Sequence, residues 1–331
     1  MNRQKIKIVV LDGNRLNPGD NPWDDVAAYG TLEVYDWTEP HQVVERAKDA
    51  DIVLTNKSLV MRDAMTQLPQ LKYISVLATG YNSVDVQAAR ERNIPVSNVP
   101  VYGTDSVAQF VFALLLELCH HVGPHGRAVA AGDWERSGLW SYHKTRLIEL
   151  VSKTMAVVGF GRIGRRVGEL AHAFGMNVLA VDIREENPPD YKPFAFTSLE
   201  DAFRQADVVS LNCALTSENE GMVNQELLAV MKPNAFIINA ARGPLIKEVD
   251  LADTLNRGAI AGAALDVVST EPVKADNPLL QAKNCIITPH IAWASLEARR
   301  RLMKTTAENI GAFLDGKPQN VVSMTSMKRI S

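Results

Sequence analysis

The chain has 331 residues, of which 46% are hydrophobic and 22% charged, and its formal net charge is −3. This length exceeds one ordinary hydrophobic core and predicts two domains, and the near balance of charge gives no reason to expect nucleic acid or an anionic membrane surface as a partner. No apolar run reaches the roughly 18 residues that cross a membrane, so we expect no insertion there.

The cysteines are odd in number, widely spaced and each within an apolar run; they are Cys119, Cys213 and Cys285. The absence of CxxC or Cys/His spacing favours reduced, buried thiols in a cytoplasmic protein and argues against a metal site. The basic residues are scattered apart from residues 299–301, which we interpret as the solvated face of a helix.

The first hundred residues alternate short apolar runs with helical patterns. The first run begins almost at the amino terminus, without the pattern of a secretion signal before it, so we expect no secretion. Such alternation predicts a parallel sheet covered by helices. The expected strands are residues 6–10, 32–35, 52–54, 73–76 and 96–97, and the expected helices are residues 41–48, 61–67 and 84–92.

Thr79 and Gly80 belong to the segment 77–82, which directly follows the expected strand 73–76. They would therefore lie at the carboxyl edge of the sheet, where ligands bind in open α/β folds. An ordinary turn explains the Thr79-Gly80 pair equally well from spacing alone.

A linker leads into a helical pattern over residues 106–122, with Thr104 or Asp105 as the N-cap. This helix is apolar almost all round, which is typical of a helix buried between domains or subunits. Residues 123–145 are less regular and include Trp140. Histidines gather here, but no carboxylate or cysteine joins them at ligand spacing, so we interpret the stretch as an exposed arm used in subunit contact.

Residues 154–182, TMAVVGFGRIGRRVGELAHAFGMNVLAVD, combine a strand, a glycine turn, a helix and a second strand that ends on Asp182. A glycine turn that follows a strand, opens a helix and is followed by an acid at the end of the next strand predicts a dinucleotide-binding Rossmann unit. A plain turn without a ligand and the glycine loop of a methyltransferase are the alternatives. The latter has no use for the residues found downstream.

The residues of this motif have separable roles. Gly159 allows the sharp turn out of the strand, Gly161 lets backbone N–H groups approach a pyrophosphate, and Gly164 lets the helix pack closely on the sheet. Asp182 lies near the roughly 20-residue spacing of the acid that binds the ribose hydroxyls. Because its carboxylate would repel a 2′-phosphate, NAD is favoured over NADP, although Arg184 softens this preference.

The βα alternation continues after this unit, with a long amphipathic helix over residues 295–314 at its end and Ser295 as the cap. Since the strands of the cofactor domain end before it, we expect this helix to return to the first domain. The expected strands are residues 208–211, 236–239, 262–266 and 285–288, and the expected helices are residues 199–204, 225–230 and 249–256.

Arg242, Glu271 and His290 each stand just beyond an expected strand, so they are candidates for one rim. An arginine offers a fork of donors to a carboxylate or carbonyl, and a histidine can donate a proton to a carbonyl oxygen as hydride reaches its carbon. A neighbouring glutamate would orient the imidazole and favour its protonated form. The set suits reduction of a 2-oxo acid, although each residue alone could be an ordinary surface or loop side chain.

The chain resembles the D-isomer-specific 2-hydroxyacid dehydrogenase family over nearly its full length. Within the family, residues 102–109 and 290–295 look most like glycerate dehydrogenases, also called hydroxypyruvate reductases. The motifs that carry the resemblance are Thr79-Gly80-Tyr81-Asn82 with Asp85, Val107-Ala108-Gln109, the glycine motif 159–164, residues 239–243, residues 264–267 leading to Glu271-Pro272, and residues 288–292.

The resemblance implies an α/β protein of two doubly wound parallel-sheet domains. A Rossmann NAD-binding domain would cover residues 103–295, and a discontinuous, flavodoxin-like substrate domain would comprise residues 1–102 and 296–331. The implied reaction is NAD-dependent reduction of hydroxypyruvate to D-glycerate, with glyoxylate as a second substrate, in a homodimer built on the cofactor domain. The substrate would sit between the domains, whose closure would exclude water before hydride transfer.

The resemblance also implies a role for each matching residue. His290 would be the acid/base, Glu271 its partner and Arg242 the substrate clamp, while the N–H groups of Thr79 and Gly80 would hold the substrate carboxylate. Arg162 and Ile163, together with Gly159, Gly161 and Gly164, would lie under the pyrophosphate of the cofactor. Asp182 would bind the ribose, and Asp266 would contact the nicotinamide carboxamide. The other residues along the cofactor would be Thr104, Thr216, Ala240, Arg242 and His290.

Some features leave alternatives open. Asn212 and Ala214 stand where the family commonly has a histidine and a proline, so the rigidity of the loop beside the cofactor is in question. Another 2-oxo acid could be the substrate, since pocket shape depends on side chains such as Trp293 and Trp140. A rival from another class is a NAD(H)-sensing, corepressor-like binding protein, which would need an exposed partner groove. Formate dehydrogenase is disfavoured, because it has a glutamine where this chain has Glu271.

Overall fold

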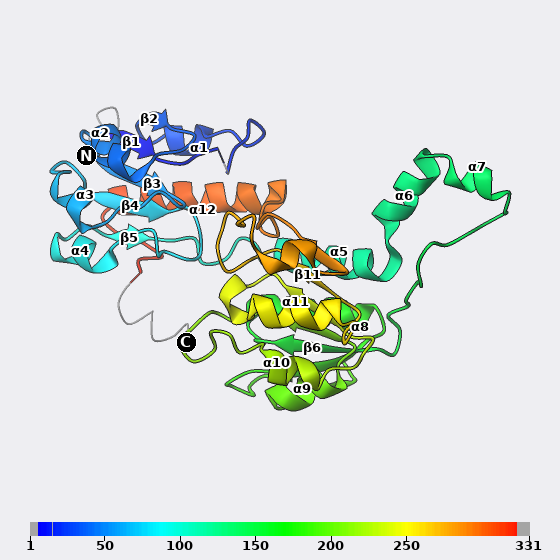
Figure 1. The fold of residues 1–331 in the computed structure, drawn as a ribbon. Coiled ribbons are helices and arrows are strands. Elements are labelled where there is room, and N and C mark those ends of the chain that lie inside the picture. The colour runs from blue at the N-terminus through cyan, green and yellow to red at the C-terminus, as the bar shows by residue number, and fades with distance from the viewer. Residues whose placement is uncertain (1–5, 15, 323–331) are drawn as a thin grey trace. The chain divides into compact units, whose positions relative to one another are not determined.

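The structure is a computed structural model and describes residues 6–14 and 16–322. The chain divides into two compact units (Figure 1). The first unit is formed by Met1–Gly103 together with Trp293–Ser331, and the second by Thr104–Ala292. The last part of the expected substrate domain, residues 323–331, lies outside the described residues. Each unit contains one parallel sheet, and the predicted α/β class is confirmed.

The sheet of the first unit has the strand order β2-β1-β3-β4-β5, with every neighbouring pair parallel. This is the flavodoxin-like doubly wound order, whose switch point lies between β1 and β3. Two of the predicted strands, β4 and β5, have the expected bounds. The strands are β1 Lys7–Val10, β2 Thr31–Val34, β3 Ile52–Thr55, β4 Tyr73–Val76 and β5 Val96–Ser97.

Alternate residues of these strands enter two different cores, because successive side chains point to opposite faces of a sheet. Val9 and Val53 pack against the short helices on one face, and Ile8 packs against the carboxyl-terminal helix α12 on the other. The one-turn helix α1 was not predicted, since its length is below any helical period. The helical segments are α1 Asp24–Ala27, η2 Pro40–Gln42, α2 Val43–Ala47, α3 Arg62–Thr66, α4 Val86–Glu91 and α12 Leu296–Leu314.

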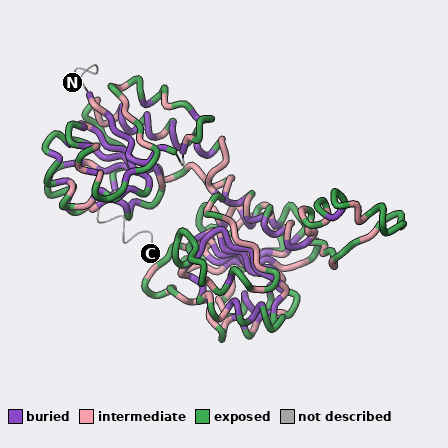
Figure 2. The backbone as a smooth tube through the Cα atoms, turned by 45° about the horizontal axis from the view of Figure 1, so that its top comes forward, coloured by how far each residue is buried: buried purple, intermediate pink, exposed green. Residues whose placement is uncertain are grey.

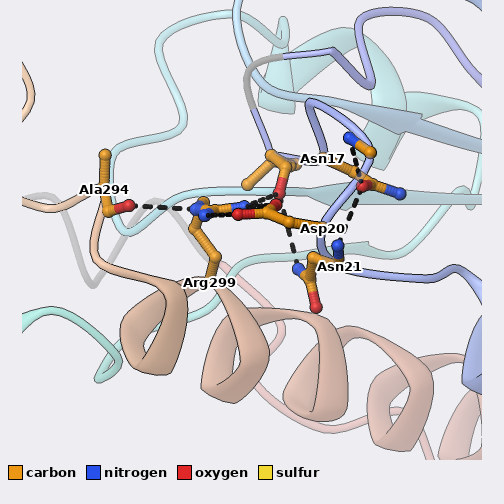
Figure 3. A network of polar contacts seen from close by, with 7 residues as sticks. Asn17, Asp20, Asn21, Ala294 and Arg299 are labelled. Atoms are coloured by element: carbon orange, nitrogen blue, oxygen red, sulfur yellow. Dashed lines mark hydrogen bonds and ion pairs between the residues drawn. The ribbon is translucent and has the colours of Figure 1, made fainter.

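The helix α12 is capped by the side chain of Ser295, as predicted, and is fastened at its start by Arg299. The Arg299 guanidinium donates to both carboxylate oxygens of Asp20, over 2.5 and 2.7 Å, and to the carbonyl oxygens of Leu16 and Ala294 (Figure 3). Only 7% of Arg299 is exposed. The interpretation of residues 299–301 as a solvated face is therefore wrong at Arg299, because the loop after β1 covers it.

The sheet of the second unit has the strand order β12-β11-β10-β9-β6-β7-β8, all parallel, which is the Rossmann order with its switch point between β6 and β9. The three-residue strand β8 was not predicted, since it is too short to show a period. The strands are β6 Thr154–Val158, β7 Asn177–Val181, β8 Phe194–Phe196, β9 Val208–Leu211, β10 Phe236–Asn239, β11 Gly262–Leu265 and β12 Cys285–Ile287.

Helices cover both faces of this sheet, and α5 packs on the same face as α8. The expected cap at Thr104 or Asp105 is wrong, because α5 already begins at Thr104. Asp105 instead accepts from Arg166 of α8 over 2.9 Å. The helical segments are α5 Thr104–His120, α8 Arg162–Ala173, α9 Leu199–Gln205, α10 Gln225–Ala229, η3 Gly243–Leu245, α11 Glu248–Asn256 and η4 Pro278–Gln281.

The predicted arm, residues 123–145, contains nearly all of two helices that the irregular pattern did not predict, α6 Val122–Ala130 and α7 Asp133–Ser137. Figure 1 shows them extending away from the sheet of their unit, and Figure 2 shows the segment largely exposed while the strands are buried. Trp140 is 92% exposed. Among the described helices none crosses a membrane by length and composition on its own, and α5 with α6 passes that test only as a pair bent by 56°.

All three cysteines are free, but only Cys119 is fully buried. The prediction of buried thiols is therefore wrong for Cys213 and Cys285, which are half-buried. Burial nevertheless raises the pKa of Cys119 and Cys213 to about 11 and that of Cys285 to about 12. Each thiol consequently stays protonated and poorly nucleophilic near neutral pH.

Candidate active site

The glycine turn after β6 has the geometry that its sequence predicts. Gly159 has a φ of +90°, and a Cβ there would lie 2.5 Å from the Cys213 nitrogen, so no other residue fits. Gly164 lies buried directly against the Gly159 carbonyl. At Gly161, the exposed N-cap of α8, a Cβ would meet no atom within 4 Å, which leaves open space at the positive end of the helix. Such a cradle fits a pyrophosphate.

Asp182 stands at the end of β7 beside this turn. Its carboxylate accepts the Phe160 N–H over 2.6 Å and the Arg184 N–H over 3.1 Å. The predicted ribose acid therefore also ties the glycine turn to β7, a second role that spacing did not reveal. At the helix start Arg162 is exposed and Ile163 is half-buried. These residues fit a bound NAD, with the pyrophosphate over the helix N-terminus and a ribose at Asp182.

The loop after β9 carries Thr216 and the departures at residues 212 and 214. Asn219 braces this loop, because its Oδ1 accepts the Thr216 N–H over 2.7 Å and its Nδ2 donates to the Ala214 carbonyl over 2.8 Å. Asn212 turns back to its own strand and donates to the Ser210 carbonyl over 3.0 Å. Side-chain hydrogen bonds thus restrain the loop where the family commonly has a proline. Nothing in the local pattern had pointed to Asn219.

Arg242, Glu271 and His290 follow β10, β11 and β12, which are adjacent parallel strands. Their carboxyl ends therefore lie at one edge of the sheet, the same edge at which β6, β7 and β9 carry the glycine turn, Asp182 and Thr216. The fold brings the sequence-predicted residues that follow the strands of this unit to a single rim. Thr104 begins α5, and the half-buried Ala240 directly follows β10.

The turn that carries Arg242 is shaped by a buried asparagine. Asn239 is fully buried, its Nδ2 donates to the Arg242 carbonyl over 2.9 Å, and its Oδ1 accepts the Ala241 N–H over 3.0 Å. The Arg242 side chain is exposed and its Nη1 donates to the Ala241 carbonyl over 2.7 Å. The guanidinium retains further N–H donors that could form a fork toward an anion.

The turn that carries His290 is held by Asp266, of which 1% is exposed. The Asp266 carboxylate accepts the Thr288 hydroxyl over 2.6 Å, the Ile291 N–H over 2.9 Å and the Ala292 N–H over 2.8 Å. These hydrogen bonds stabilise a turn in which His290 has a φ of +56°. Most residues other than glycine avoid this conformation. The resemblance assigned Asp266 a cofactor contact, and the structure adds this bracing of the histidine.

Glu271 and His290 form a direct pair, with 2.7 Å between Glu271 Oε2 and His290 Nδ1. Both side chains are about one-third exposed. A carboxylate on Nδ1 holds the proton at that nitrogen, so Nε2 is left to exchange a proton with a substrate.

The loop between β11 and β12 that carries Glu271 is stapled by Glu248 of α11. The Glu248 carboxylate accepts the Ser269 N–H over 2.7 Å, the Ser269 hydroxyl over 2.6 Å and an amide hydrogen of Asn277 over 3.0 Å. Both ends of an exposed loop are thereby joined to one helix. The pattern of the sequence had not singled out Glu248.

In the first unit, Thr79 and Gly80 are exposed and follow β4 at the carboxyl edge of the five-stranded sheet. Asn98 Nδ2 donates to the Thr79 carbonyl over 2.7 Å. The structure thus places this pair at the kind of edge where the sequence predicted it, in the unit other than that of Arg242, Glu271 and His290.

A Rossmann sheet with an open glycine cradle, and a carboxylate-oriented histidine on its rim, define an oxidoreductase of the dinucleotide-dependent class. The model of the family "D-isomer specific 2-hydroxyacid dehydrogenase, NAD binding domain" matches residues 112–292. The chain belongs to this family, and its cofactor is NAD, as predicted.

Named relatives and a solved structure agree with this membership. The chain is 50% identical over 321 residues to a hydroxypyruvate reductase of Blautia hydrogenotrophica, covering 96% of this chain and 100% of the relative. It is 37% identical over 318 residues to a glycerate dehydrogenase of Methylorubrum extorquens, covering 96% and 98%. A solved D-2-hydroxyisocaproate dehydrogenase matches with a TM-score of 0.83 at 26% identity, covering 96% and 99%.

Proposed function

We propose that this protein reduces hydroxypyruvate to D-glycerate with NADH, and glyoxylate to glycolate as a second reaction. The observation that carries the proposal is the 2.7 Å pair of Glu271 and His290 on the rim that also holds Arg242. The 50% identity to a relative named hydroxypyruvate reductase supports this choice of substrate.

The reduction joins a hydride and a proton to the substrate carbonyl. A bound NADH would supply the hydride that the carbonyl carbon accepts. His290 donates its Nε2 proton to the carbonyl oxygen, which becomes the hydroxyl, and Glu271 holds the ring in orientation through Nδ1. Because a proton is consumed, reduction is the favoured direction near neutral pH.

Binding groups come from both units in this proposal. Arg242 would pair with the carboxylate or carbonyl oxygen, and the N–H groups of Thr79 and Gly80 would hold the carboxylate. The cofactor would be bound by the glycine turn with Arg162 and Ile163, by Asp182 at a ribose, and by Asp266 at the nicotinamide carboxamide. The remaining cofactor contacts proposed are Thr104, Thr216, Ala240, Arg242 and His290.

A homodimer is part of the proposal. The arm and helix α6 carry exposed apolar side chains, among them Val122, Leu139 and Trp140. Side chains of this kind are enriched where proteins meet, so a second copy of the chain would cover them. A cytoplasmic location is proposed as well, since the three cysteines are free and the cytosol keeps thiols reduced.

The test follows NADH absorbance with purified protein and hydroxypyruvate, glyoxylate, pyruvate, 2-oxoisocaproate or phenylpyruvate, and repeats the best of them with NADPH. We expect the highest kcat/KM with hydroxypyruvate and NADH. Preference for a bulky oxo acid would keep the chemistry and overturn the substrate. Binding of NADH without turnover on any of them would favour the alternative of a NAD(H)-sensing binding protein.

A further inference from the structure

The backbone at Thr79 and Gly80 is held from its inner side by the loop after β5. Asn98 Nδ2 donates to the Thr79 carbonyl over 2.7 Å, and the Val99 N–H donates to the Ala78 carbonyl over 3.0 Å. The Thr79 hydroxyl in turn donates to the Val99 carbonyl over 2.9 Å. Two consecutive carbonyl groups are therefore turned toward residues 98 and 99.

Peptide geometry then decides where two N–H groups point. These peptides are trans, so in each plane the N–H lies on the side opposite the C=O. The Ala78 carbonyl shares its plane with the Thr79 N–H, and the Thr79 carbonyl shares its plane with the Gly80 N–H. Both N–H groups face away from the β5 loop, and neither donates to a protein acceptor within residues 6–14 and 16–322.

Asn98 is itself fixed by α12 and the segment after it. Its N–H donates to the Asn320 carbonyl over 3.1 Å, and its carbonyl accepts from Asn309 Nδ2 over 3.0 Å. Asn320 Nδ2 donates to Asn309 Oδ1 over 2.8 Å. Asn98 is 8% exposed and Asn309 is fully buried. The amide that holds Thr79 is therefore anchored on its other side to a long helix.

The strand ends on the opposite side of Thr79 are tied in the same manner. The fully buried Asp12 carboxylate, after β1, accepts the N–H groups of Asn56 and Ser58 over 2.7 and 2.8 Å. Asn56 Nδ2 donates to the Leu77 carbonyl over 2.6 Å. Buried hydrogen bonds thus run along the carboxyl edge of the sheet from β1 through β3 and β4 to β5, and Thr79 lies within this chain.

We propose that Asn98 is a positioning residue for the substrate carboxylate. By holding the Thr79 carbonyl it fixes the peptide plane that presents the Gly80 N–H, while its neighbour Val99 fixes the plane that presents the Thr79 N–H. The inference rests on the proposed function, in which these two donors bind the carboxylate. Hydrogen bonds to a carboxylate are stronger than neutral ones, so rotation of one donor out of line weakens substrate binding substantially.

The first test substitutes Asn98 in two ways. Asn98→Ala removes the donor, and the nearly isosteric Asn98→Asp replaces it by an acceptor that faces the Thr79 carbonyl. For both variants we expect KM for hydroxypyruvate to rise about 10-fold or more, with kcat changed less than about 3-fold. The Kd of NADH, measured by fluorescence titration, should stay at the wild-type value, because the cofactor residues lie in the other unit.

A matched control is Asn177→Asp, since Asn177 Nδ2 also donates to a backbone carbonyl, that of Ser152, over 3.2 Å. It should leave KM at the wild-type value. Thermal unfolding of each variant, followed by circular dichroism, establishes that the protein measured is folded.

Three results would overturn the inference while the wild type still reduces hydroxypyruvate. The first is an unchanged KM in folded Asn98→Ala. The second is a higher KM in Asn98→Asp alone, which would be charge repulsion of the substrate and not lost positioning. The third is an equal loss of kcat and NADH affinity, which would indicate a merely structural role. A wild type inactive on hydroxypyruvate would instead overturn the proposed function.

Discussion

At the scale of single residues, His290 is fixed from two directions. Glu271 holds its ring at Nδ1, and Asp266 holds the backbone of its turn through Ile291 and Ala292. A histidine with a positive φ persists because buried hydrogen bonds stabilise the turn around it. The Nε2 atom is therefore presented at the rim in one orientation, which is what an acid/base needs before its substrate arrives.

The histidine gives the most direct prediction about chemistry. His290→Ala removes the proposed proton donor, and turnover of hydroxypyruvate with NADH should fall about 10²-fold or more. The Kd of NADH should change little, because the glycine turn and Asp182 are untouched. Steady-state kinetics and NADH fluorescence titration measure the two effects. Wild-type turnover in the folded variant would refute the assignment of His290.

At the scale of elements, the exposed loop that carries Glu271 depends on α11. Glu248 receives hydrogen bonds from Ser269 and Asn277, which lie on either side of Glu271. A carboxylate that accepts from both ends closes the loop, and closure limits the positions that the Glu271 side chain can reach. The placement of the pair with His290 is thus decided partly by a helix that has no residue in the pair.

Glu248→Gln tests this dependence, because the amide loses one acceptor oxygen and cannot keep all three bonds. We expect kcat with hydroxypyruvate to fall between about 3- and 30-fold, with the Kd of NADH unchanged. Glu226→Gln, on an exposed acid of α10, is the matched control and should behave as the wild type. If both variants keep full kcat, the hydrogen bonds of Glu248 to Ser269 and Asn277 have no effect on the pair of Glu271 and His290.

At the scale of the whole molecule, the chain begins and ends in the same unit. The helix α12 completes a core of that unit through Leu302 and Ile310, about 200 residues after the last strand of its sheet. Arg299 at the start of α12 clasps Asp20 in the loop after β1. The return of the chain is therefore secured by apolar packing along the helix and by an ion pair at its beginning.

This ion pair should make stability depend on pH in a defined direction. The hydrogen bond from Arg299 lowers the pKa of Asp20 below its ordinary value. Because the folded value is the lower one, the contribution is complete above the unfolded pKa of about 3.9 and is lost as pH falls through the folded value. Asp20→Asn should thus lower Tm by at most a few degrees at pH 7, since Asp20 is solvent-exposed.

The same comparison at low pH supplies the control. In the acid range the wild-type carboxylate is itself protonated, so the difference in Tm between wild type and Asp20→Asn should shrink toward zero. Calorimetric scans of both proteins at a series of pH values from 7 downward measure this difference in Tm. A difference that stays constant, or grows in acid, would show that the charge of Asp20 is not what stabilises the clasp.

Local patterns were sufficient for every described strand except β8 and for the glycine turn. A period of two or 3.6 residues identifies an element from its own sequence, and β4, β9 and β10 have the predicted bounds. Parallel strands also bring the residues beyond their carboxyl ends to one edge of the sheet, so Arg242, Glu271 and His290 could be grouped without coordinates. The short segments α1, β8 and α7 were missed, because a few residues show no period or face, and the nine-residue α6 was missed because its stretch was interpreted as irregular.

By itself the sequence determined the fold class and the cofactor, since strand and helix periods and the glycine motif depend on residues close together in the chain. For the site residues it gave a prediction, made through the family resemblance. Only the tertiary structure decided which distant side chains support the Thr79-Gly80 backbone and which secure α12. Asn98 and Asn309 are 211 positions apart, and Arg299 and Asp20 are 279 apart. Such pairs leave no periodic signal in the sequence, because the partner of a buried polar side chain is decided by which distant residues the completed fold places next to it.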